Sequence, residues 1–503
     1  MTFLELLAGA EVLAQSGNPQ VSGVEYDSRR VKPGNLFVAM RGEASDGNRF
    51  LGQAIASGAV AVVTDSDQQP SGVAWARVPH GRRALAVVSQ NFYGRPAARL
   101  AITGITGTNG KSTTAFLIES ILVAARRNCA LVGTIEYHVA GRVLAAPHTT
   151  PEALELQRIF RQAADDGATE VVMEVSSHAL AQGRTYGIPF EVAVFTNLTR
   201  DHLDYHTTME EYFAAKRVLF EGSGGPEPQF AVVNVDDEAG VGLAKFSKSQ
   251  GSQVITYGLA HGDFHATKVE ISAHGTRFHV VTPHDTIPVH AHLIGRVNVY
   301  NILAASAAAY ARGCSSQAIE EGVRALGRVP GRFERVDCGQ AFTVVVDFAH
   351  TDDALRNLTA LAREFVKASG GHVITVFGCG GDRDRTKRPL MGEAAGKGSD
   401  FVVLTSDNPR SEDPAAIIKD AAVGLERSGA RYQTEPDRGA AIHLAVNMAK
   451  PGDIVLIAGK GHEKSQILAT GPVPFDDTEA AAEALGELGY GRARTAAKLE
   501  TRA

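Results

Sequence analysis

A glycine-rich heptapeptide followed by a helical pattern is the part of the sequence with the clearest chemical potential. Residues 107–113 read Gly-Thr-Asn-Gly-Lys-Ser-Thr and follow the apolar stretch 100–102. A strand that leads into such a turn and then a helix presents backbone N–H groups, a helix N-terminus and a lysine to a phosphate. The hydroxyl of Ser112 or Thr113 can bind Mg²⁺. The sequence therefore predicts a nucleoside triphosphate site made by Gly107, Thr108, Asn109, Gly110, Lys111, Ser112 and Thr113.

This loop differs from the general phosphate-loop pattern, which has glycine six residues before the lysine. That position is Ile105 here. A glycine-rich turn without a nucleotide is therefore the alternative. Apolar residues recur at helical spacing directly after Thr113, at Phe116, Leu117 and Ile121, and this continuation favours the phosphate loop.

Two further segments place acidic and imidazole groups near the predicted loop. Glu174 lies at the end of the apolar run 171–175, where a carboxylate can hold Mg²⁺ directly or through water. A structural pairing of Glu174 with a buried base is the alternative. Residues 201–206, Asp-His-Leu-Asp-Tyr-His, follow another apolar run. Their spacing does not match a zinc motif, so we expect these side chains to ligate Mg²⁺ at most, or to orient other groups.

Lys216 lies on the apolar face of a predicted helix over residues 209–220. Its neighbours three and four positions away are Tyr212, Phe213, Leu219 and Phe220. A buried ammonium is unfavourable without a partner, or it loses its charge. Either the lysine extends its stem toward water, or its neutral amine is chemically modified or paired in an active site.

The C-terminal third alternates strands and helices, and polar clusters follow four of its predicted strands. These clusters are residues 347–350, 378–385, 407–410 and 459–463. In open parallel sheets ligands bind beyond the carboxyl ends of the strands. Four clusters at one edge therefore predict a binding site, whereas ordinary solvated loops are the alternative.

The charges in these clusters are suited to a zwitterionic amino acid. Arg410, aimed by Pro409, offers a guanidinium fork for a carboxylate, and Arg383 can join it. Glu463 can hold an ammonium group. An exposed turn with an unengaged arginine is the alternative.

Composition limits the function classes. A chain of 503 residues with 44% hydrophobic residues predicts two to four globular domains. A net charge of −6 argues against nucleic acid as a partner. Four scattered cysteines predict a reducing compartment and no zinc site. The N-terminal residues carry no basic segment, and no apolar run is long enough for a bilayer, so we expect a cytoplasmic protein without membrane insertion.

Taken together, these motifs resemble the Mur ligase family. The resemblance is carried by the loop 107–113, by Glu174 with 176–178, by 201–206, by 298–301 and by the C-terminal clusters 347–350, 380–384 and 459–463. It implies an α/β fold of three domains: a small N-terminal α/β domain for the UDP end of the substrate (1–97), a central P-loop ATPase-like parallel-sheet domain (98–328), and a C-terminal Rossmann-like domain for the incoming amino acid (329–503).

The resemblance also implies the roles of individual residues. Nucleotide contacts from the later part of the chain are Asn298, Arg332 and Asp347. Contacts to the UDP-muramoyl-dipeptide are Ser28, Glu43, Ala44, Ser45, Thr149, Thr150, Ser176, Gln182 and Arg184. Amino-acid contacts are Arg383, Asp407, Asn408, Pro409, Arg410, Gly459 and Glu463. The catalytic residues are Lys111, Glu174, His202 and Lys216. Lys216 matches the family's lysine that is carbamylated by CO₂, which as a carbamate would join Ser112, Glu174 and His202 as Mg²⁺ ligands.

Residues 407–410 resemble the form of the family that uses ATP to add meso-2,6-diaminopimelate to UDP-N-acetylmuramoyl-L-alanyl-D-glutamate. The implied reaction forms an acyl phosphate and belongs to cytoplasmic peptidoglycan precursor synthesis, and hence to cell shape and cell division. We expect a monomer with small-molecule substrates only. A lysine-adding ligase, a folylpolyglutamate synthase-like ligase and a nucleotide-binding module without turnover are the alternatives.

Overall fold

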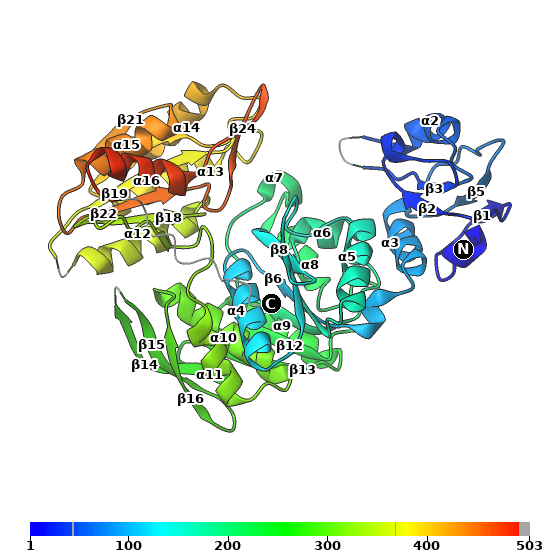
Figure 1. Ribbon diagram of the computed structural model, residues 1–503, viewed down its shortest axis with the longest axis horizontal. Helices are drawn as coiled ribbons and strands as arrows, with labels where there is room; N and C mark the ends of the chain where they lie inside the picture. The colour runs from blue at the N-terminus through cyan, green and yellow to red at the C-terminus, as the bar shows by residue number, and fades with distance from the viewer. Residues whose placement is uncertain (43–44, 273, 368, 492–503) are drawn as a thin grey trace.

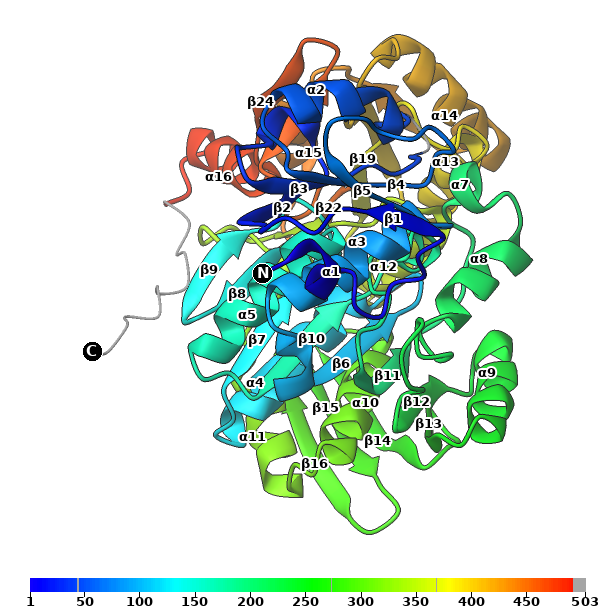
Figure 2. The same cartoon turned by 90° about the vertical axis from the view of Figure 1, so that its right-hand side faces the viewer.

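The computed structural model describes residues 1–42, 45–272, 274–367 and 369–491. The described chain forms three sheet-containing bodies that follow one another along the sequence (Figure 1). In Figure 1 the N-terminal and C-terminal bodies stand apart above the central body, and in Figure 2, turned by 90°, these two bodies overlap in the view. No helix within the described part of the chain is both long and apolar enough to cross a membrane.

The N-terminal body is a five-stranded sheet in the order β1-β5-β4-β3-β2, parallel except for β1. Its central strands β3 and β4 are fully buried, as expected for apolar runs covered on both faces. Its elements are α1 (Phe3–Leu6), β1 (Ala14–Ser16), β2 (Gly23–Glu25), β3 (Asn35–Val38), α2 (Leu51–Ala56), β4 (Ala61–Thr64), β5 (Ala74–Arg77) and α3 (Gly81–Phe92).

The central body is an eleven-stranded sheet in the order β16-β15-β14-β13-β12-β11-β6-β10-β7-β8-β9. The strands from β14 to β7 in this order are parallel, whereas β15, β16, β8 and β9 add antiparallel extensions at the two ends. The strands are β6 (Ala101–Thr106), β7 (Cys129–Val132), β8 (Glu136–Val139), β9 (Arg142–Ala145), β10 (Glu170–Glu174), β11 (Phe190–Phe195), β12 (Phe230–Asn234), β13 (Gln253–Gly258), β14 (Phe264–Ser272), β15 (Gly275–Val281) and β16 (Thr286–Ala291).

Helices cover both faces of this sheet, because alternate strand residues bury themselves in two separate cores. Val172 faces a core that includes Phe116 of α4, whereas its neighbour Met173 faces a core that includes Phe160 of α5. The helices are α4 (Lys111–Ala124), α5 (Ala153–Asp165), α6 (Ser177–Ala181), α7 (Leu203–His206), α8 (Met209–Arg217), α9 (Glu238–Ser249), α10 (Arg296–Ala311) and α11 (Ser316–Ala325).

The C-terminal body is a six-stranded sheet in the order β17-β18-β22-β19-β20-β21, parallel except for β17, with a separate hairpin of β23 and β24. Its strands are β17 (Glu334–Arg335), β18 (Thr343–Asp347), β19 (Val373–Cys379), β20 (Phe401–Ser406), β21 (Tyr432–Thr434), β22 (Ile454–Ala458), β23 (Ser465–Leu468) and β24 (Gly471–Pro474). Its helices are α12 (Asp352–Val366), α13 (Lys387–Gly398), α14 (Pro414–Ser428), α15 (Arg438–Met448) and α16 (Asp477–Glu487).

The α/β class and the four strands predicted before the C-terminal polar clusters are confirmed. Those strands, β18, β22, β19 and β20, are direct neighbours, so their carboxyl ends meet at one edge. Three features were not predicted from the sequence: the short strands β17 and β21 and the antiparallel extensions of the central sheet. The helix predicted over residues 209–220 ends earlier, at Arg217.

Candidate active site

One cavity of about 700 Å³ lies between the carboxyl edges of the central and C-terminal sheets. Lys111 and Arg410, which belong to different bodies, both line it. The predicted residues on its walls are Thr108, Asn109, Gly110, Lys111, Ser112, Thr113, Thr149, Glu174, Ser176, His202, Asn298, Arg332, Asp347, Arg383, Asp407, Asn408, Arg410, Gly459 and Glu463. The structure therefore brings most of the predicted nucleotide, metal and amino-acid residues to a single space.

The loop between β6 and α4 has a geometry that glycine makes possible. Gly107 and Gly110 have φ angles of 146° and 87°, in the region that other residues rarely adopt. A Cβ atom at Gly107 would collide with Oγ1 of Thr196, and one at Gly110 would collide with Oδ1 of Asn301. The loop is therefore packed closely enough that its glycines are required by space as well as by backbone conformation.

Lys111 is the first residue of α4 and folds back over this loop. Its Nζ donates to the carbonyl oxygens of Gly107 at 3.0 Å and Thr108 at 2.8 Å. Burial lowers the pKa of Lys111, and the nearby carboxylate of Glu174 opposes that shift. The amine and the helix N-terminus converge on the cavity, which is the arrangement that a phosphate requires.

Glu174, the last residue of β10, accepts hydrogen bonds from hydroxyl groups of two neighbouring segments. Ser112 Oγ donates to its Oε2 at 3.0 Å, and Thr134 donates through Oγ1 at 2.9 Å and through its backbone N–H at 2.7 Å. Among the described residues, no group of three or more His, Cys, Asp or Glu side chains is arranged to hold a metal ion. A carboxylate beside a hydroxyl at the mouth of a phosphate loop nevertheless fits the oxygen ligands that Mg²⁺ prefers.

Lys216 is buried, with 1% of its surface exposed. Its Nζ donates to the carbonyl oxygen of Gly107 at 2.8 Å and lies 4.1 Å from the ring centroid of Tyr212. Burial, and secondarily the charge of Lys111, places the pKa of Lys216 well below its ordinary value. The alternative in which this side chain extends its stem toward water is therefore excluded. The amine points to the underside of the phosphate loop and does not itself line the cavity.

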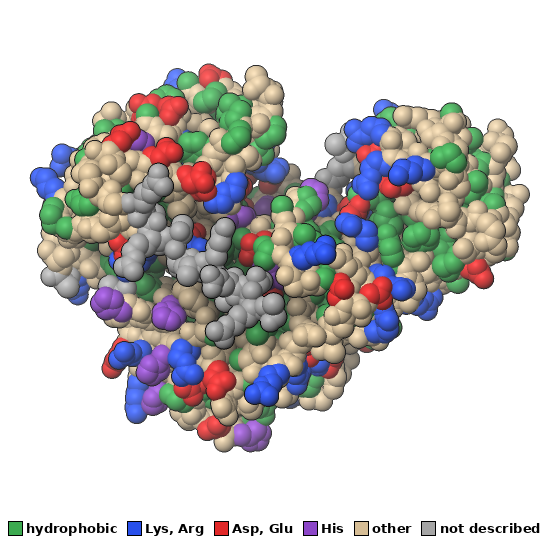
Figure 3. All heavy atoms as spheres, in the orientation of Figure 1, with side chains coloured by type: hydrophobic (Ala, Val, Ile, Leu, Met, Phe, Trp, Pro, Cys, Tyr) green, Lys and Arg blue, Asp and Glu red, His purple; other side chains and the backbone are tan. Residues whose placement is uncertain are grey.

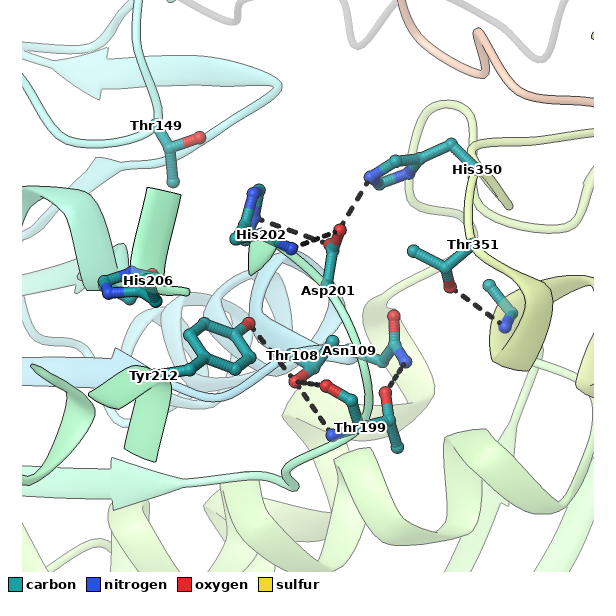
Figure 4. A network of polar contacts seen from close by, with 12 residues as sticks. Thr108, Asn109, Thr149, Thr199, Asp201, His202, His206, Tyr212, His350 and Thr351 are labelled. Atoms are coloured by element: carbon teal, nitrogen blue, oxygen red, sulfur yellow. Dashed lines mark hydrogen bonds and ion pairs between the residues drawn. The ribbon is translucent and has the colours of Figure 1, made fainter. Parts of the chain in front are cut away.

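His202 and Asp201 lie where the two bodies meet (Figure 4). His202 has a φ of 55°, and its Nε2 is 3.4 Å from Oδ2 of Asp201. From the C-terminal body, His350 Nε2 approaches Asp201 to 3.8 Å and Lys387 Nζ to 3.9 Å. Burial lowers the pKa of His202, so the neutral ring is favoured. An imidazole in this form is able to ligate a metal.

The predicted muramoyl-dipeptide residues of the central body form one hydrogen-bonded network beside the cavity. Arg184 donates to Gln182 Oε1 at 2.7 Å and to the Thr150 carbonyl at 2.8 Å. Thr150 Oγ1 donates to the carbonyl of Glu174 at 2.9 Å. Thr149 and Ser176 line the cavity, whereas Thr150, Gln182 and Arg184 do not.

The predicted residues of the N-terminal body do not line this cavity. Ser28 is buried and donates to Gln53 Oε1 at 3.1 Å, and Ser45 is exposed. Glu43 and Ala44 lie outside the described residues. Figure 3 shows a wide gap between the N-terminal and C-terminal bodies, open above the central one. A substrate that contacted both Ser28 and the walls of the cavity would have to be long enough to extend across this gap.

On the far wall of the cavity, two loops carry the predicted amino-acid residues. Arg410 Nη1 donates to the Gly381 carbonyl at 2.7 Å, so the arginine ties its own loop to the one that carries Arg383. Burial, followed by the charge of Arg383, lowers the pKa of Arg410. Two guanidinium groups near one another are suited to an anionic ligand. At Gly459, whose φ is 119°, a Cβ would lie 2.5 Å from Oδ2 of Asp407, so glycine keeps that carboxylate in place.

The nucleotide residues from the later part of the chain lie on the remaining walls. Asn298 donates to the Ile294 carbonyl at 2.7 Å. Arg332 donates to Ser112 Oγ at 3.2 Å, with its guanidinium carbon 4.7 Å from the Phe348 ring centroid. Asp347 accepts from the Phe333 backbone N–H at 2.7 Å. Arg332 thus makes a direct contact from the C-terminal body to the phosphate loop.

Two residues with evident structural roles at this site were missed by the sequence analysis. Asp353 Oδ2 accepts from Nδ2 of Asn109 at 3.1 Å, a second contact across the two bodies. Lys460 is buried between Asn408 and Glu463. Lys460 belongs to the predicted polar cluster 459–463, but the sequence does not reveal that it is buried. Its burial shows that its ammonium group is paired within the protein and not with solvent.

Three family models match the chain. The Mur ligase family catalytic domain matches residues 20–93, the Mur ligase middle domain matches residues 105–309, and the Mur ligase glutamate ligase domain matches residues 331–461.

Known proteins resemble the chain over nearly its full length. A protein of Solibacter usitatus named UDP-N-acetylmuramoyl-L-alanyl-D-glutamate–2,6-diaminopimelate ligase is 53% identical, with 96% of each chain covered. A solved structure of a ligase with the same name is 35% identical and has a TM-score of 0.68, covering 97% of this chain and 99% of its own. A Mycobacterium tuberculosis folylpolyglutamate synthase is 19% identical with a TM-score of 0.63, covering 80% of this chain and 95% of its own, and shares the fold alone. This chain belongs to the Mur ligase family.

Proposed function

We propose that the chain joins meso-2,6-diaminopimelate to the D-glutamyl carboxylate of UDP-N-acetylmuramoyl-L-alanyl-D-glutamate, with conversion of ATP to ADP and phosphate. The observation that carries this proposal is that Lys111 and Arg410 line one cavity. A phosphate-binding loop and a pair of arginines suited to a carboxylate are thereby held within reach of a common substrate. Relatives with this activity in their names cover almost the whole chain.

The chemistry requires activation, because an oxygen of a free carboxylate is a poor leaving group. Transfer of the γ-phosphoryl group of ATP to the D-glutamyl carboxylate gives an acyl phosphate. Attack by the amine of the acceptor on the acyl carbon then forms the amide and releases phosphate. Lys111 would neutralise negative charge as the phosphoryl group moves. The N–H groups of Thr108 and Asn109 donate to Asn197, so the N–H groups at the start of α4, in residues 110–113, would hold the β- and γ-phosphates.

Mg²⁺ would be held by Ser112, Glu174, His202 and the carbamate of Lys216. When bound, the ion supplies charge neutralisation at the phosphates and orients the reacting oxygens. The amine of Lys216 donates to the carbonyl of Gly107, and burial places its pKa well below the ordinary value, which favours the neutral form that would react with CO₂. Carbamate formation releases one proton and converts a buried amine into an oxygen ligand.

Arg383 and Arg410 would bind the distal carboxylate of the acceptor, and Glu463 would accept from its ammonium. Asp407, Asn408, Pro409 and Gly459 shape this end of the cavity. Asn298, Arg332 and Asp347 would contact the nucleotide. The muramoyl-dipeptide would run along Thr149, Thr150, Ser176, Gln182 and Arg184 toward Ser28 and residues 43–45. Because these groups come from three bodies, we expect closure of domains 1–97, 98–328 and 329–503 around the substrates.

Three alternatives are separated by simple comparisons. L-lysine has no distal carboxylate, so a lysine-adding ligase would not need two arginines there. The presence of both Arg383 and Arg410 at the cavity therefore favours diaminopimelate as the acceptor. A folylpolyglutamate synthase-like activity uses no UDP-linked substrate, so it gives Ser28 and residues 43–45 no role. A nucleotide-binding module without turnover has no reason to keep Lys111, Glu174, His202 and Lys216 together. We further propose a monomer that acts in the cytoplasm in peptidoglycan synthesis, and thereby supports cell shape and division.

The test is an ATP-dependent ligation assay with UDP-N-acetylmuramoyl-L-alanyl-D-glutamate and a panel of amino acids. Phosphate release that requires both the nucleotide-sugar substrate and diaminopimelate, with little release for L-lysine or L-glutamate, is the expected result. Equal release with L-lysine would favour the lysine-adding alternative, and release without any acceptor would contradict ligation.

A further inference from the structure

Lys460 is a buried cation that none of the roles above uses. It follows β22 directly after Gly459, and its side chain is 0% exposed. Taking an ammonium out of water is strongly unfavourable unless it is paired and hydrogen-bonded. The hydrogen-bond partners of Lys460 therefore indicate the role of its charge.

Both hydrogen-bond partners of the amine belong to the proposed acceptor site. Lys460 Nζ donates to Glu463 Oε2 at 2.8 Å and to Asn408 Oδ1 at 3.0 Å. Asn408 Nδ2 in turn donates to the same Glu463 oxygen at 2.8 Å. The three side chains thus form a closed triangle behind the cavity. Asn408 and Glu463 line the cavity, and Lys460 does not.

The triangle fixes the orientation of both cavity-lining groups. The backbone N–H of Ile467 also donates to Asn408 Oδ1, at 2.9 Å, so two donors hold that oxygen. A flipped amide would place its NH₂ group against both donors. On Glu463, two hydrogen bonds converge on Oε2, and within the described residues no donor is placed on Oε1. The carboxylate therefore has one anchored oxygen and one oxygen available to a ligand.

We propose that Lys460 is a positioning residue for the acceptor amino acid: it holds Glu463 and Asn408 so that Glu463 Oε1 faces the ammonium of the bound acceptor. This role rests on the proposed function, and it explains how the Glu463 carboxylate is oriented toward the incoming amino acid. Because Lys460 acts through Glu463, its removal should weaken acceptor binding without changing the nucleotide site.

The experiment compares Lys460→Met, which removes the charge and the donors, with Lys460→Gln, which removes the charge and keeps an amide donor. Both are made in the full chain, and their thermal unfolding is compared with wild type. We expect the KM for diaminopimelate to rise about tenfold or more in Lys460→Met, because hydrogen bonds to a charged group are lost. The KM for ATP and kcat should stay within about twofold. Lys464→Gln, an exposed lysine in the same segment, is the matched control and should leave every constant unchanged.

A double-mutant cycle with Glu463→Gln tests the proposed route. If Lys460 acts through Glu463, adding Lys460→Met to Glu463→Gln should raise the KM for diaminopimelate by less than about twofold. Full additivity of the two effects, or an unchanged KM in a folded Lys460→Met or Lys460→Gln protein, would overturn the proposal. If Lys460→Met does not fold, Lys460→Gln decides with the same criteria. Wild-type protein that shows no diaminopimelate-dependent turnover would instead refute the proposed function.

Discussion

Arg410 offers the sharpest test of acceptor recognition. Its guanidinium lines the cavity, half-buried, and is held by a 2.7 Å hydrogen bond to the Gly381 carbonyl. We expect Arg410→Ala to remove at least one charge-assisted hydrogen bond to the distal carboxylate of diaminopimelate, a loss of about 1.5–3 kcal/mol. At about 1.4 kcal/mol per factor of ten, kcat/KM for diaminopimelate should fall about 10- to 150-fold.

The assay is steady-state phosphate release with each substrate varied in turn. The loss should be confined to diaminopimelate, while the KM values for ATP and for the nucleotide-sugar substrate remain within about twofold. L-lysine lacks the distal carboxylate, so the ratio of kcat/KM for diaminopimelate to that for L-lysine should fall. Arg324→Ala, an exposed arginine of α11, is the control. An equal fall for both acceptors, or a change that appears in the KM for ATP instead, would refute this account of Arg410.

Three further predictions concern other parts of the chain. His138 has its pKa lowered by burial and raised by hydrogen bonds to two glutamates, with a net rise to about 9. The protonated His138 should stabilise the folded state by about 3 kcal/mol at most. This contribution should be complete below pH 6.5 and disappear as the pH rises through 9. In urea denaturation, His138→Gln should therefore be less stable than wild type at pH 6 but not at pH 10. Arg438 and Asp477 form a fully buried ion pair, so Arg438→Met should destabilise the C-terminal body by about 3–5 kcal/mol. Adding Asp477→Leu to the same chain should restore much of the lost stability. An unaltered denaturant midpoint in Arg438→Met would contradict the burial of the pair. Lys111→Ala should lower kcat by about 10²- to 10³-fold or more with an unchanged far-ultraviolet circular dichroism spectrum, and retained turnover would exclude Lys111 from phosphoryl transfer.

The repeating strand–helix pattern of the chain was predictable because buried parallel strands are continuous apolar runs. All five residues of β10 are buried, and residues 171–173 at its centre are such a run. The antiparallel extensions were not predictable in the same way. In β14 and β9 many side chains are exposed, so hydrophobic periodicity is weak. The short strand β21 has only three residues, fewer than a pattern needs to be recognised.

The candidate site was predictable to the extent that its residues stand at the ends of apolar strands or inside recognisable motifs. Lys216 was identifiable because its helical neighbours are apolar. Its hydrogen bond to Gly107, 109 positions earlier in the chain, depends on tertiary packing that no local pattern contains. For the same reason the sequence gives no sign that Lys460 meets Asn408, or that Asp353 meets Asn109 across two bodies.

Activation of the D-glutamyl carboxylate by phosphorylation is the step on which the proposed function depends. A substrate whose D-glutamyl carboxylates are labelled with ¹⁸O reports on this step. During ligation to diaminopimelate, each phosphate released should carry one oxygen from the substrate carboxylate, as measured by mass spectrometry. Phosphate released without the label, while the amide product forms at the normal rate, would contradict activation by phosphorylation.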